Sequence, residues 1–207
     1  VEREIYQIFP GARIARADSQ TMKNPRFYSE IYQKFSKQHI DILVGTQIIS
    51  KGWDLPSVSL VGIIDADNLF SIPDLDTNVR AYQNIVQVSG RSGRPGAKFS
   101  GSVVIQTFNP EHFVIKAAAN RNYRLLYEKE LSERRILSMP PFGKIIKLIF
   151  QDSNSKKVDL ETARVFLDLS KEKVGKAKIY EPQTPLIPNV RGRWRKQIII
   201  KVINEKF

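Results

Sequence analysis

QVSGRSGR, residues 87–94, places two arginines three positions apart among glycines. The preceding stretch 78–89 has apolar residues at helical spacing, so we expect a helix that ends within this motif. The residues that would lie at the end of that helix and in the following turn are Gln87, Gly90, Arg91 and Arg94. A guanidinium group is a planar, permanently charged fork that matches phosphate oxygens in pairs. Glycine lets the backbone approach a ligand closely and relaxes the φ restriction. The motif predicts a phosphate-binding turn, and a solvated basic turn is the alternative.

A second motif, GTQIISKGWDLPSV at residues 45–58, follows the short apolar run 41–44. We read that run as a buried strand, which puts the motif at the strand's carboxyl end. Ligands of open α/β sheets bind at this edge. The turn Gly45-Thr46-Gln47 lies at this edge, and Lys51-Gly52 ends the short helical segment that follows it.

The order of elements predicts an α/β fold. Apolar runs typical of strands alternate with amphipathic helical stretches, which indicates a parallel sheet with helices on both faces. The strands are expected at 12–17, 41–44, 59–65 and 101–107, and the helices at 25–37, 78–89 and 111–137. Pro140-Pro141 interrupts the last helix. A small α+β domain follows, with strands at 144–150, 178–181 and 194–202 and a helix at 160–174. We therefore predict two domains, 1–139 and 140–207.

Composition and charge exclude several classes of protein. The chain has a net charge of +12, which makes a polyanion the natural partner. It contains no cysteine, and His39 and His112 lie far apart, so neither a disulfide nor a zinc site is expected. No apolar run is long enough to cross a membrane and no leader is visible. The absence of cysteine fits a cytoplasmic protein.

Positive charge is concentrated after residue 139, where 15 Lys and Arg face 7 Asp and Glu. Arg191, Arg193 and Arg195 alternate with other residues at the approach to the last strand. They would share one face, with Trp194 on the other. We expect the arginines to contact DNA phosphates or an acidic protein segment. For Trp194 we favour a core position over base stacking.

Asp65 and Asp67 end the strand 59–65 and form a candidate carboxylate pair. A metal or acid–base role would need a third group that the sequence does not reveal. We therefore favour loop capping over catalysis for this pair.

The two motifs resemble motifs V and VI of superfamily 2 helicases: GTQ…KG is the motif V pattern, and QVSGRSGR fits Q-x-x-G-R-x-G-R. Three further stretches occur in the order seen in the bacterial PriA family of replication-restart helicases, also called primosomal protein N′. They are PDLDTNVRAYQ (73–83), ERRILSMPPF (133–142) and RGRWRKQIIIK (191–201). The resemblance covers essentially the whole chain.

The resemblance implies that residues 1–139 are the second of two RecA-like lobes, incomplete at the start. Residues 140–207 would be a basic C-terminal domain that lacks its last helix and strand. In such helicases ATP and Mg²⁺ bind between the lobes. Full-length members also hold zinc, in a cysteine-rich segment before the point where this chain begins.

The resemblance also implies roles for single residues. Arg94 would be the arginine finger, Arg91 would contact or position the same phosphates, and Gln87 would link the nucleotide to the adjacent lobe. Gly45, Thr46, Gln47, Lys51 and Gly52 would sense DNA and couple it to the cleft between the lobes, with Thr46 and Lys51 as the contacts to the DNA backbone. The complete enzyme would be an ATP-driven 3′→5′ helicase for replication restart and primosome assembly in the bacterial cytoplasm. Its partners would be branched or single-stranded DNA, the N-terminal helicase lobe, primosome proteins and single-stranded-DNA-binding proteins, with no membrane.

The sequence contains neither a GxxxxGK[ST] phosphate loop nor a DExH-type acidic box. We therefore expect that the chain alone does not hydrolyse ATP. One alternative is a non-catalytic module that binds DNA or a primosome partner through residues 141–207. Another is a different superfamily 2 motor, such as a repair translocase.

Overall fold

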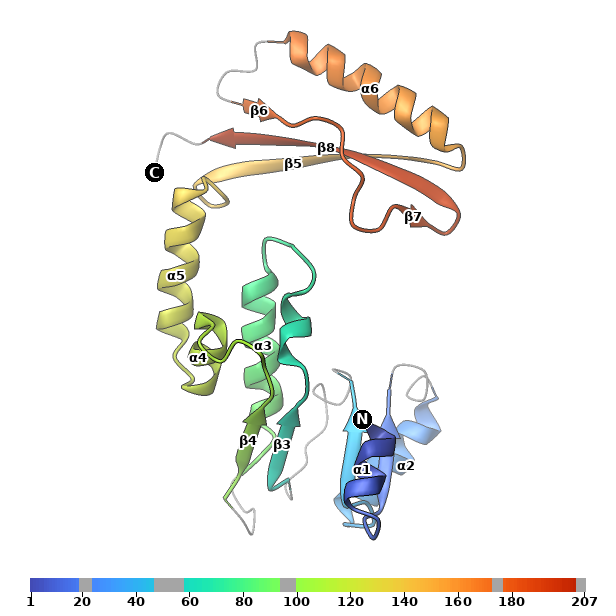
Figure 1. The fold of residues 1–207 in the computed structure, drawn as a ribbon, viewed down its shortest axis with the longest axis vertical. Helices are drawn as coiled ribbons and strands as arrows, with labels where there is room; N and C mark the ends of the chain where they lie inside the picture. The colour runs from blue at the N-terminus through green and yellow to red at the C-terminus, as the bar shows by residue number, and fades with distance from the viewer. Residues whose placement is uncertain (19–23, 47–57, 94–99, 173–176, 204–207) are drawn as a thin grey trace. The chain divides into compact units, whose positions relative to one another are not determined.

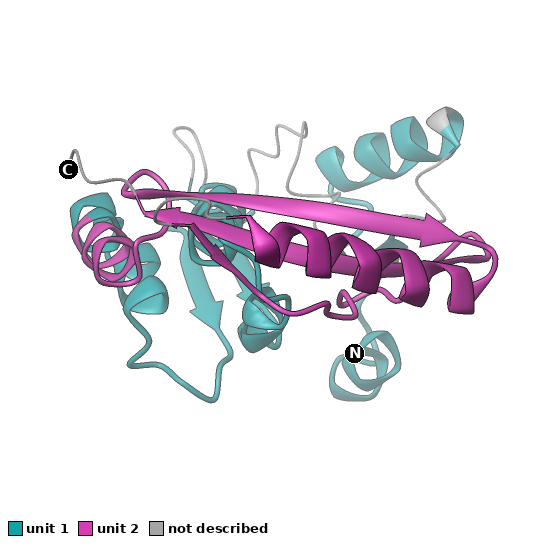
Figure 2. Cartoon of the chain, turned by 90° about the horizontal axis from the view of Figure 1, so that it is seen from above, with its two compact units in different colours: residues 1–127 teal, residues 128–207 magenta. Residues whose placement is uncertain are grey.

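The computed structural model of the protein describes residues 1–18, 24–46, 58–93, 100–172 and 177–203 (Figure 1). The chain forms two compact units, Val1–Tyr127 and Glu128–Phe207 (Figure 2). This division falls within the helix Tyr123–Ile136. The domain boundary at 139/140, which we placed at Pro140-Pro141, stays a prediction. None of the described helices is both long and apolar enough to cross a bilayer.

Unit 1 begins with two helices and a pair of parallel strands. These elements are α1 (Glu2–Ile8), β1 (Ile14–Ala17), α2 (Pro25–Ser36) and β2 (Ile42–Gly45). The side chain of Asn24 accepts a hydrogen bond from the Arg26 N–H (3.0 Å) and caps α2. Ile31 of α2 and Ile40 form a buried cluster, against which Phe27 and Phe35 pack. The apolar residues of this helix therefore form part of the core of unit 1.

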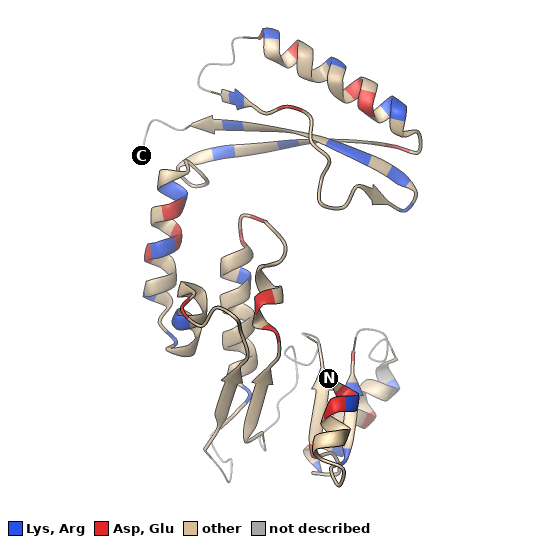
Figure 3. Ribbon diagram, viewed as in Figure 1, with Lys and Arg blue, Asp and Glu red and all other residues tan. Residues whose placement is uncertain are grey.

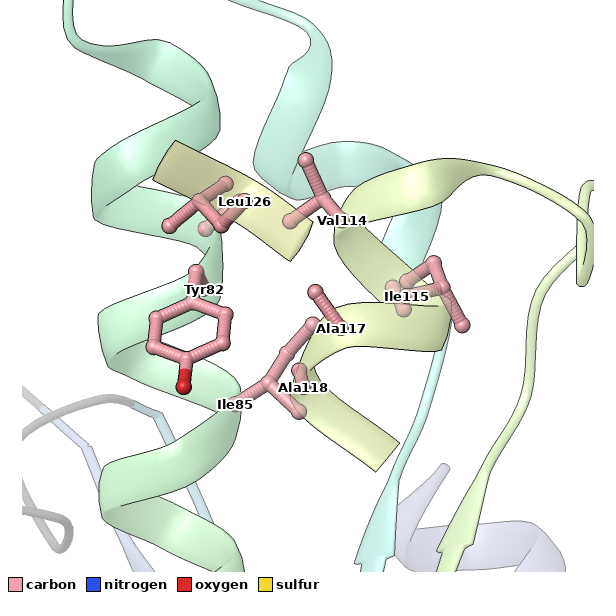
Figure 4. Packing of buried hydrophobic residues seen from close by; sticks show 9 residues of the cluster. Tyr82, Ile85, Val114, Ile115, Ala117, Ala118 and Leu126 are labelled. Carbon is pink, nitrogen blue, oxygen red and sulfur yellow. The ribbon is translucent and has the colours of Figure 1, made fainter. Parts of the chain in front are cut away.

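The rest of unit 1 contains a second parallel pair, a 3-10 helix and three α-helices. These elements are β3 (Leu60–Ile63), a 3-10 helix (Ala66–Phe70), α3 (Thr77–Ser89), β4 (Ser102–Ile105), α4 (Phe113–Ala119) and the start of α5 (Tyr123–Ile136). Tyr82 and Ile85 of α3 pack against Val114 and Ala118 of α4 and Leu126 of α5 (Figure 4). This cluster holds the helix that carries the first motif.

The predicted α/β class is confirmed, with two corrections. The strands pair in parallel, β1 with β2 and β3 with β4, but in the described residues they form two separate sheets and not one. The stretch 111–137 is also not a single helix. Arg121 has φ of +50°, and the Asn122 side chain accepts a hydrogen bond from the Leu125 N–H (3.0 Å). The chain therefore leaves α4 at residues 120–122, and the Asn122 side chain caps the first turn of a new helix, α5.

Unit 2 is the predicted small α+β domain. Its elements are the end of α5, β5 (Gly143–Asp152), α6 (Ser155–Lys171), β6 (Ala177–Ile179), β7 (Asn189–Val190) and β8 (Arg193–Ile203). The antiparallel sheet has the order β5-β8-β6, and β7 pairs with the start of β8. Helix α6 packs on one face of the sheet, where Val158, Thr162 and Ile198 are buried. It begins at residue 155 and not at 160, because the Asn154 side chain accepts hydrogen bonds from two N–H groups of its first turn.

Candidate phosphate-contact site

The first motif lies at the carboxyl end of α3, as predicted. Ala81, Tyr82 and Ile85 bury one face of this helix in the core. Gln87 lies on another face and is exposed. Arg91 follows in the turn and is half-buried. Arg94 lies outside the described residues.

Backbone hydrogen bonds hold the turn after α3. The Gly90 N–H donates to the Val86 carbonyl (2.9 Å), and the Arg91 N–H donates to the Val88 carbonyl (3.0 Å). Gly93 has φ of +64°, so the expectation that glycine relaxes the φ restriction holds there. It is wrong for Gly90, whose φ is −68° because this residue still continues the helical path.

The turn is also joined to the amino ends of β3 and β4. The Gly93 N–H donates to the carbonyl of Val58 (3.2 Å), just before β3. A Cβ added to Gly93 would lie 2.6 Å from the backbone nitrogen of Gly101, just before β4. Two backbone segments therefore meet here with no room for a side chain between them.

The second motif starts at the carboxyl end of β2, also as predicted. Gly45 is the last residue of β2, and the Thr46 N–H donates to the carbonyl of Ala17 at the end of β1 (3.4 Å). Gly45 and Thr46 are both exposed. Gln47, Lys51 and Gly52 lie outside the described residues. Arg16, beside this edge, pairs with Asp18 at 2.6 Å.

The carboxylate pair after β3 caps loops. Asp67 accepts hydrogen bonds from the Phe108 N–H (2.9 Å) and the Thr107 hydroxyl (2.9 Å). The Phe108 N–H contributes most to holding the pKa of Asp67 below its ordinary value. Asp65 accepts a hydrogen bond from the Asn68 side chain. A hollow of about 250 Å³ lies beside Asp67, but the bonds of both carboxylates are those of capping groups, as we favoured.

The predicted row of three arginines is broken in the structure. Arg191 and Gly192 have φ of +52° and +78° and form the two-residue turn between β7 and β8. Positive φ at both central residues is typical of a tight hairpin turn. Arg191 therefore does not share a strand face with Arg193 and Arg195. The Asn189 side chain supports the turn by accepting a hydrogen bond from the Gly192 N–H (3.0 Å).

Arg193 and Arg195 instead belong to a larger basic surface, which we call the basic sheet face. Strand pairing places Lys147 opposite Ile199 and Lys178 opposite Lys201, on the face opposite to Lys196, which pairs with Asp159 of α6. Figure 3 marks the Lys and Arg positions along these strands. The basic residues of the basic sheet face are Lys147, Lys178, Arg193, Arg195 and Lys201. No Asp or Glu occurs among the strand residues that share this face. Its three lysines are not predicted from the sequence, because the strand register that aligns them is not visible there.

Trp194 is 46% exposed, so the core position that we favoured for it is wrong. It shares a strand face with the buried Ile198 but lies at the hairpin end of β8. There its cross-strand neighbours are polar, Asp152 on β5 and Asn189 on β7.

Residues 2–96 match the family described as the helicase conserved C-terminal domain. Nearly the whole chain is also similar to curated proteins called replication restart protein PriA. The Synechocystis protein is 35% identical over 97% of this chain and 24% of its own length. The Bacillus subtilis protein is 32% identical over 99% of this chain and 25% of its length. The Rickettsia felis protein is 33% identical over the whole chain and 31% of its length.

A solved structure, the C-terminal domain of the DEAD-box protein Dbp5, covers 62% of this chain and 73% of its own. Its TM-score is 0.38 at 14% identity. The curated PriA relatives are much longer than this chain, which spans about a quarter to a third of their length.

Proposed function

We propose that the chain belongs to the PriA family and is the motif-bearing second lobe and C-terminal domain of an ATP-dependent 3′→5′ DNA helicase. The complete protein would restart replication and assemble the primosome on branched or single-stranded DNA. Its other contacts would be the N-terminal helicase lobe, primosome proteins and single-stranded-DNA-binding proteins.

The turn after α3 is the observation that supports this proposal most strongly. It presents Gln87 and Arg91 from one end of a helix that is packed into the core of unit 1. Arg94, three residues after Arg91, would act as the arginine finger and neutralise charge that develops on the transferred phosphoryl group. Arg91 would hold the same phosphates, and Gln87 would connect them to the adjacent lobe.

The guanidinium groups of Arg91 and Arg94 would suit the phosphates of ATP, because a planar, charged fork matches phosphate oxygens in pairs. Gly90 would allow close approach. Bound ATP would supply the phosphoryl group and Mg²⁺ would offset its charge. Among the described residues no three His, Cys, Asp or Glu side chains gather as a metal site requires. We propose that ligands outside this chain hold both Mg²⁺ and the family's zinc.

DNA would be contacted from two places. Gly45, Thr46, Gln47, Lys51 and Gly52 would sense the DNA backbone and couple it to the nucleotide. The basic sheet face of unit 2 would bind further phosphates, since cations at alternate positions of a strand are about 6.5–7 Å apart. Arg191 would reach a phosphate separately, from the hairpin turn.

We test the proposal by DNA-stimulated ATP turnover of the complete protein with Arg94→Ala. Loss of an arginine finger should lower kcat by about 10³–10⁵-fold. Arg80→Ala is the matched control, because Arg80 lies at the other end of α3 and pairs with Asp74 (3.4 Å). Its turnover should stay close to that of the parent. Equal turnover of Arg94→Ala and the parent would show that Arg94 is structural.

The chain by itself is proposed to be inactive, since the phosphate loop and the acidic box would come from the N-terminal lobe. Purified chain should hydrolyse ATP only after that lobe is added as a separate polypeptide. Robust DNA-stimulated turnover by the chain alone would overturn this part of the proposal.

The basic sheet face favours a second candidate, a module that binds DNA without a catalytic role. The two candidates differ in what they require of Arg94. A binding module should retain its DNA affinity and its contribution to the complete protein after Arg94→Ala. The helicase proposal requires that DNA affinity be retained while turnover is lost.

A further inference from the structure

The contact between Gly93 and Gly101 joins the turn after α3, residues 90–93, to the start of β4, and we call this turn the arginine turn. Gly93 has a left-handed φ of +64°, which L side chains rarely adopt. In addition, a Cβ at this position would meet the Gly101 backbone nitrogen at 2.6 Å and its Cα at 2.9 Å. A Cβ on Gly101 would in turn collide with the backbone of Ser92 and Gly93. The separation of the two segments therefore depends on glycine at both positions.

Val58 joins the same turn to a different part of unit 1. Its carbonyl accepts the hydrogen bond from the Gly93 N–H (3.2 Å). Its side chain packs against the buried cluster formed by Ile31 of α2 and by Ile40. Val58 is also the last residue of the second motif, which begins at Gly45 on the end of β2. One residue therefore contacts both the core beside the second motif and the turn of the first.

We propose that Gly101 is a positioning residue for nucleotide hydrolysis, acting on Arg91 and Arg94 through Gly93. The missing side chain of Gly101 lets the turn lie against the strand, where Val58 holds it by its carbonyl. Gly93 lies two residues after Arg91 and directly precedes Arg94, so a displacement of Gly93 would displace the backbone that carries both arginines. This inference rests on the proposed function, because it assumes that these arginines contact the nucleotide.

The test uses the complete protein with Gly101→Ala and measures DNA-stimulated ATP turnover. Gly62→Ala is the matched control, because Gly62 lies on β3 and has nothing within 4 Å of a Cβ at its position. Displacement of the turn by about 1 Å should lower kcat by about 10²-fold. The KM for ATP should stay within a few-fold, because an arginine finger acts mainly in the transition state. Gly62→Ala should match the parent.

Two further measurements separate positioning from loss of fold. Resistance of unit 1 to limited proteolysis reports whether it is folded, and it should equal that of the parent in Gly101→Ala. Gly93→Asn provides a second variant, because Asn tolerates a left-handed φ while its Cβ still meets Gly101. It should also lose kcat, and it decides the question if Gly101→Ala does not fold.

The outcomes distinguish this inference from the proposed function. No turnover by the parent would reject the proposed function. An active parent with turnover of Gly101→Ala or Gly93→Asn within about twofold of it would reject the inference alone. A kcat loss matched by an equal loss of the proteolytic resistance of unit 1 would also reject it, because Gly101 would then serve folding only.

Discussion

The arginine turn of unit 1 and the basic sheet face of unit 2 both present cations, but they are built differently. The turn is held by backbone hydrogen bonds and by a glycine contact that leaves no space for a Cβ. The basic sheet face distributes five cations over three strands, and Lys147, Lys178 and Arg193 are exposed. The arginine turn fixes the direction and distance of its cationic groups, whereas the basic sheet face acts through its total charge.

This difference predicts different responses to substitution. A group that neutralises charge in a transition state must keep its position and the shape of its donors. A surface that attracts a polyanion depends mainly on the number of its charges and on salt. Substitutions that keep charge but change shape should therefore separate the two regions.

The largest difference is expected from replacing arginine by lysine in both regions. Arg94→Lys keeps the charge but loses the planar fork, so kcat of the complete protein should fall by about 10³-fold or more. Arg193→Lys keeps the charge that a phosphate needs, so DNA affinity should change by less than about threefold. Turnover and DNA binding of both variants measure this. Equal tolerance at the two positions would remove the distinction between them.

The next largest effect concerns the cores beneath the two regions. Ile85 is 1% exposed in unit 1 and Ile198 is 0% exposed in unit 2. Truncation of either to Ala leaves a cavity and should lower the free energy of unfolding by about 2–5 kcal/mol. Ile85→Ala should reduce turnover by loosening α3, and Ile198→Ala should reduce DNA binding by loosening β8.

Denaturant unfolding of both variants, together with turnover and DNA binding, measures these effects. Leu167→Ala is a control, since Leu167 is apolar but 58% exposed on α6. Its unfolding free energy should change by less than about 1 kcal/mol. If Ile198→Ala abolished turnover and left DNA binding intact, the assignment of roles to the units would be reversed.

The sequence predicts the regions whose signals are local. The apolar spacing of 78–89 identifies α3 to within one residue, and the run before Gly45 identifies the strand end that exposes Thr46. These patterns arise from hydrogen bonds within an element and from one buried face. Helix ends set by a single asparagine were less visible, as at Asn122 and Asn154.

Features that depend on pairing between distant segments could not be predicted. The basic sheet face exists because antiparallel register aligns Lys178 with Lys201, and a one-residue slip would place them on opposite faces. Arg191 does not align with Arg193 and Arg195, because Arg191 and Gly192 have positive φ and turn the chain. The role of Gly101 is set by Gly93, which approaches from a separate turn.

A smaller effect is expected from single charges on the basic sheet face. Each Lys or Arg that contacts a DNA phosphate contributes about 0.9 to the slope of log affinity against log salt. Lys147→Ala and Arg195→Ala should each lower that slope by about this amount, and together by about twice as much. Lys196→Ala is the control, because Lys196 lies on the opposite face and pairs with Asp159 of α6 (3.4 Å). A slope unchanged by both variants would exclude this face from DNA contact.

The smallest effect concerns a charge pair in unit 1 that has fixed geometry. Asp41 accepts hydrogen bonds from the Nε (2.9 Å) and the backbone N–H (2.8 Å) of Arg13. Arg13 thereby lowers the pKa of Asp41 to about 2 from its ordinary 3.8. Because the pKa is lower in the folded state, the stabilisation is present above about pH 4 and is lost as the pH falls towards 2. Asp41→Asn should therefore unfold at lower denaturant concentration than the parent at pH 5, and the difference should shrink by pH 2.

Arg13→Gln provides the control for this pair. In that background Asp41→Asn should have little effect at either pH, because the partner that lowers the pKa is gone. Directed hydrogen bonds should also make the effect less sensitive to salt than DNA binding by the basic sheet face, whose contacts release counterions. The contrary result is that 0.5 M salt abolishes the difference in unfolding between Asp41→Asn and the parent at pH 5, just as it weakens DNA binding. The Arg13–Asp41 pair would then stabilise the fold through net charge and not through directed hydrogen bonds. The contrast between fixed geometry in unit 1 and summed charge in unit 2 would then hold for the arginine turn alone.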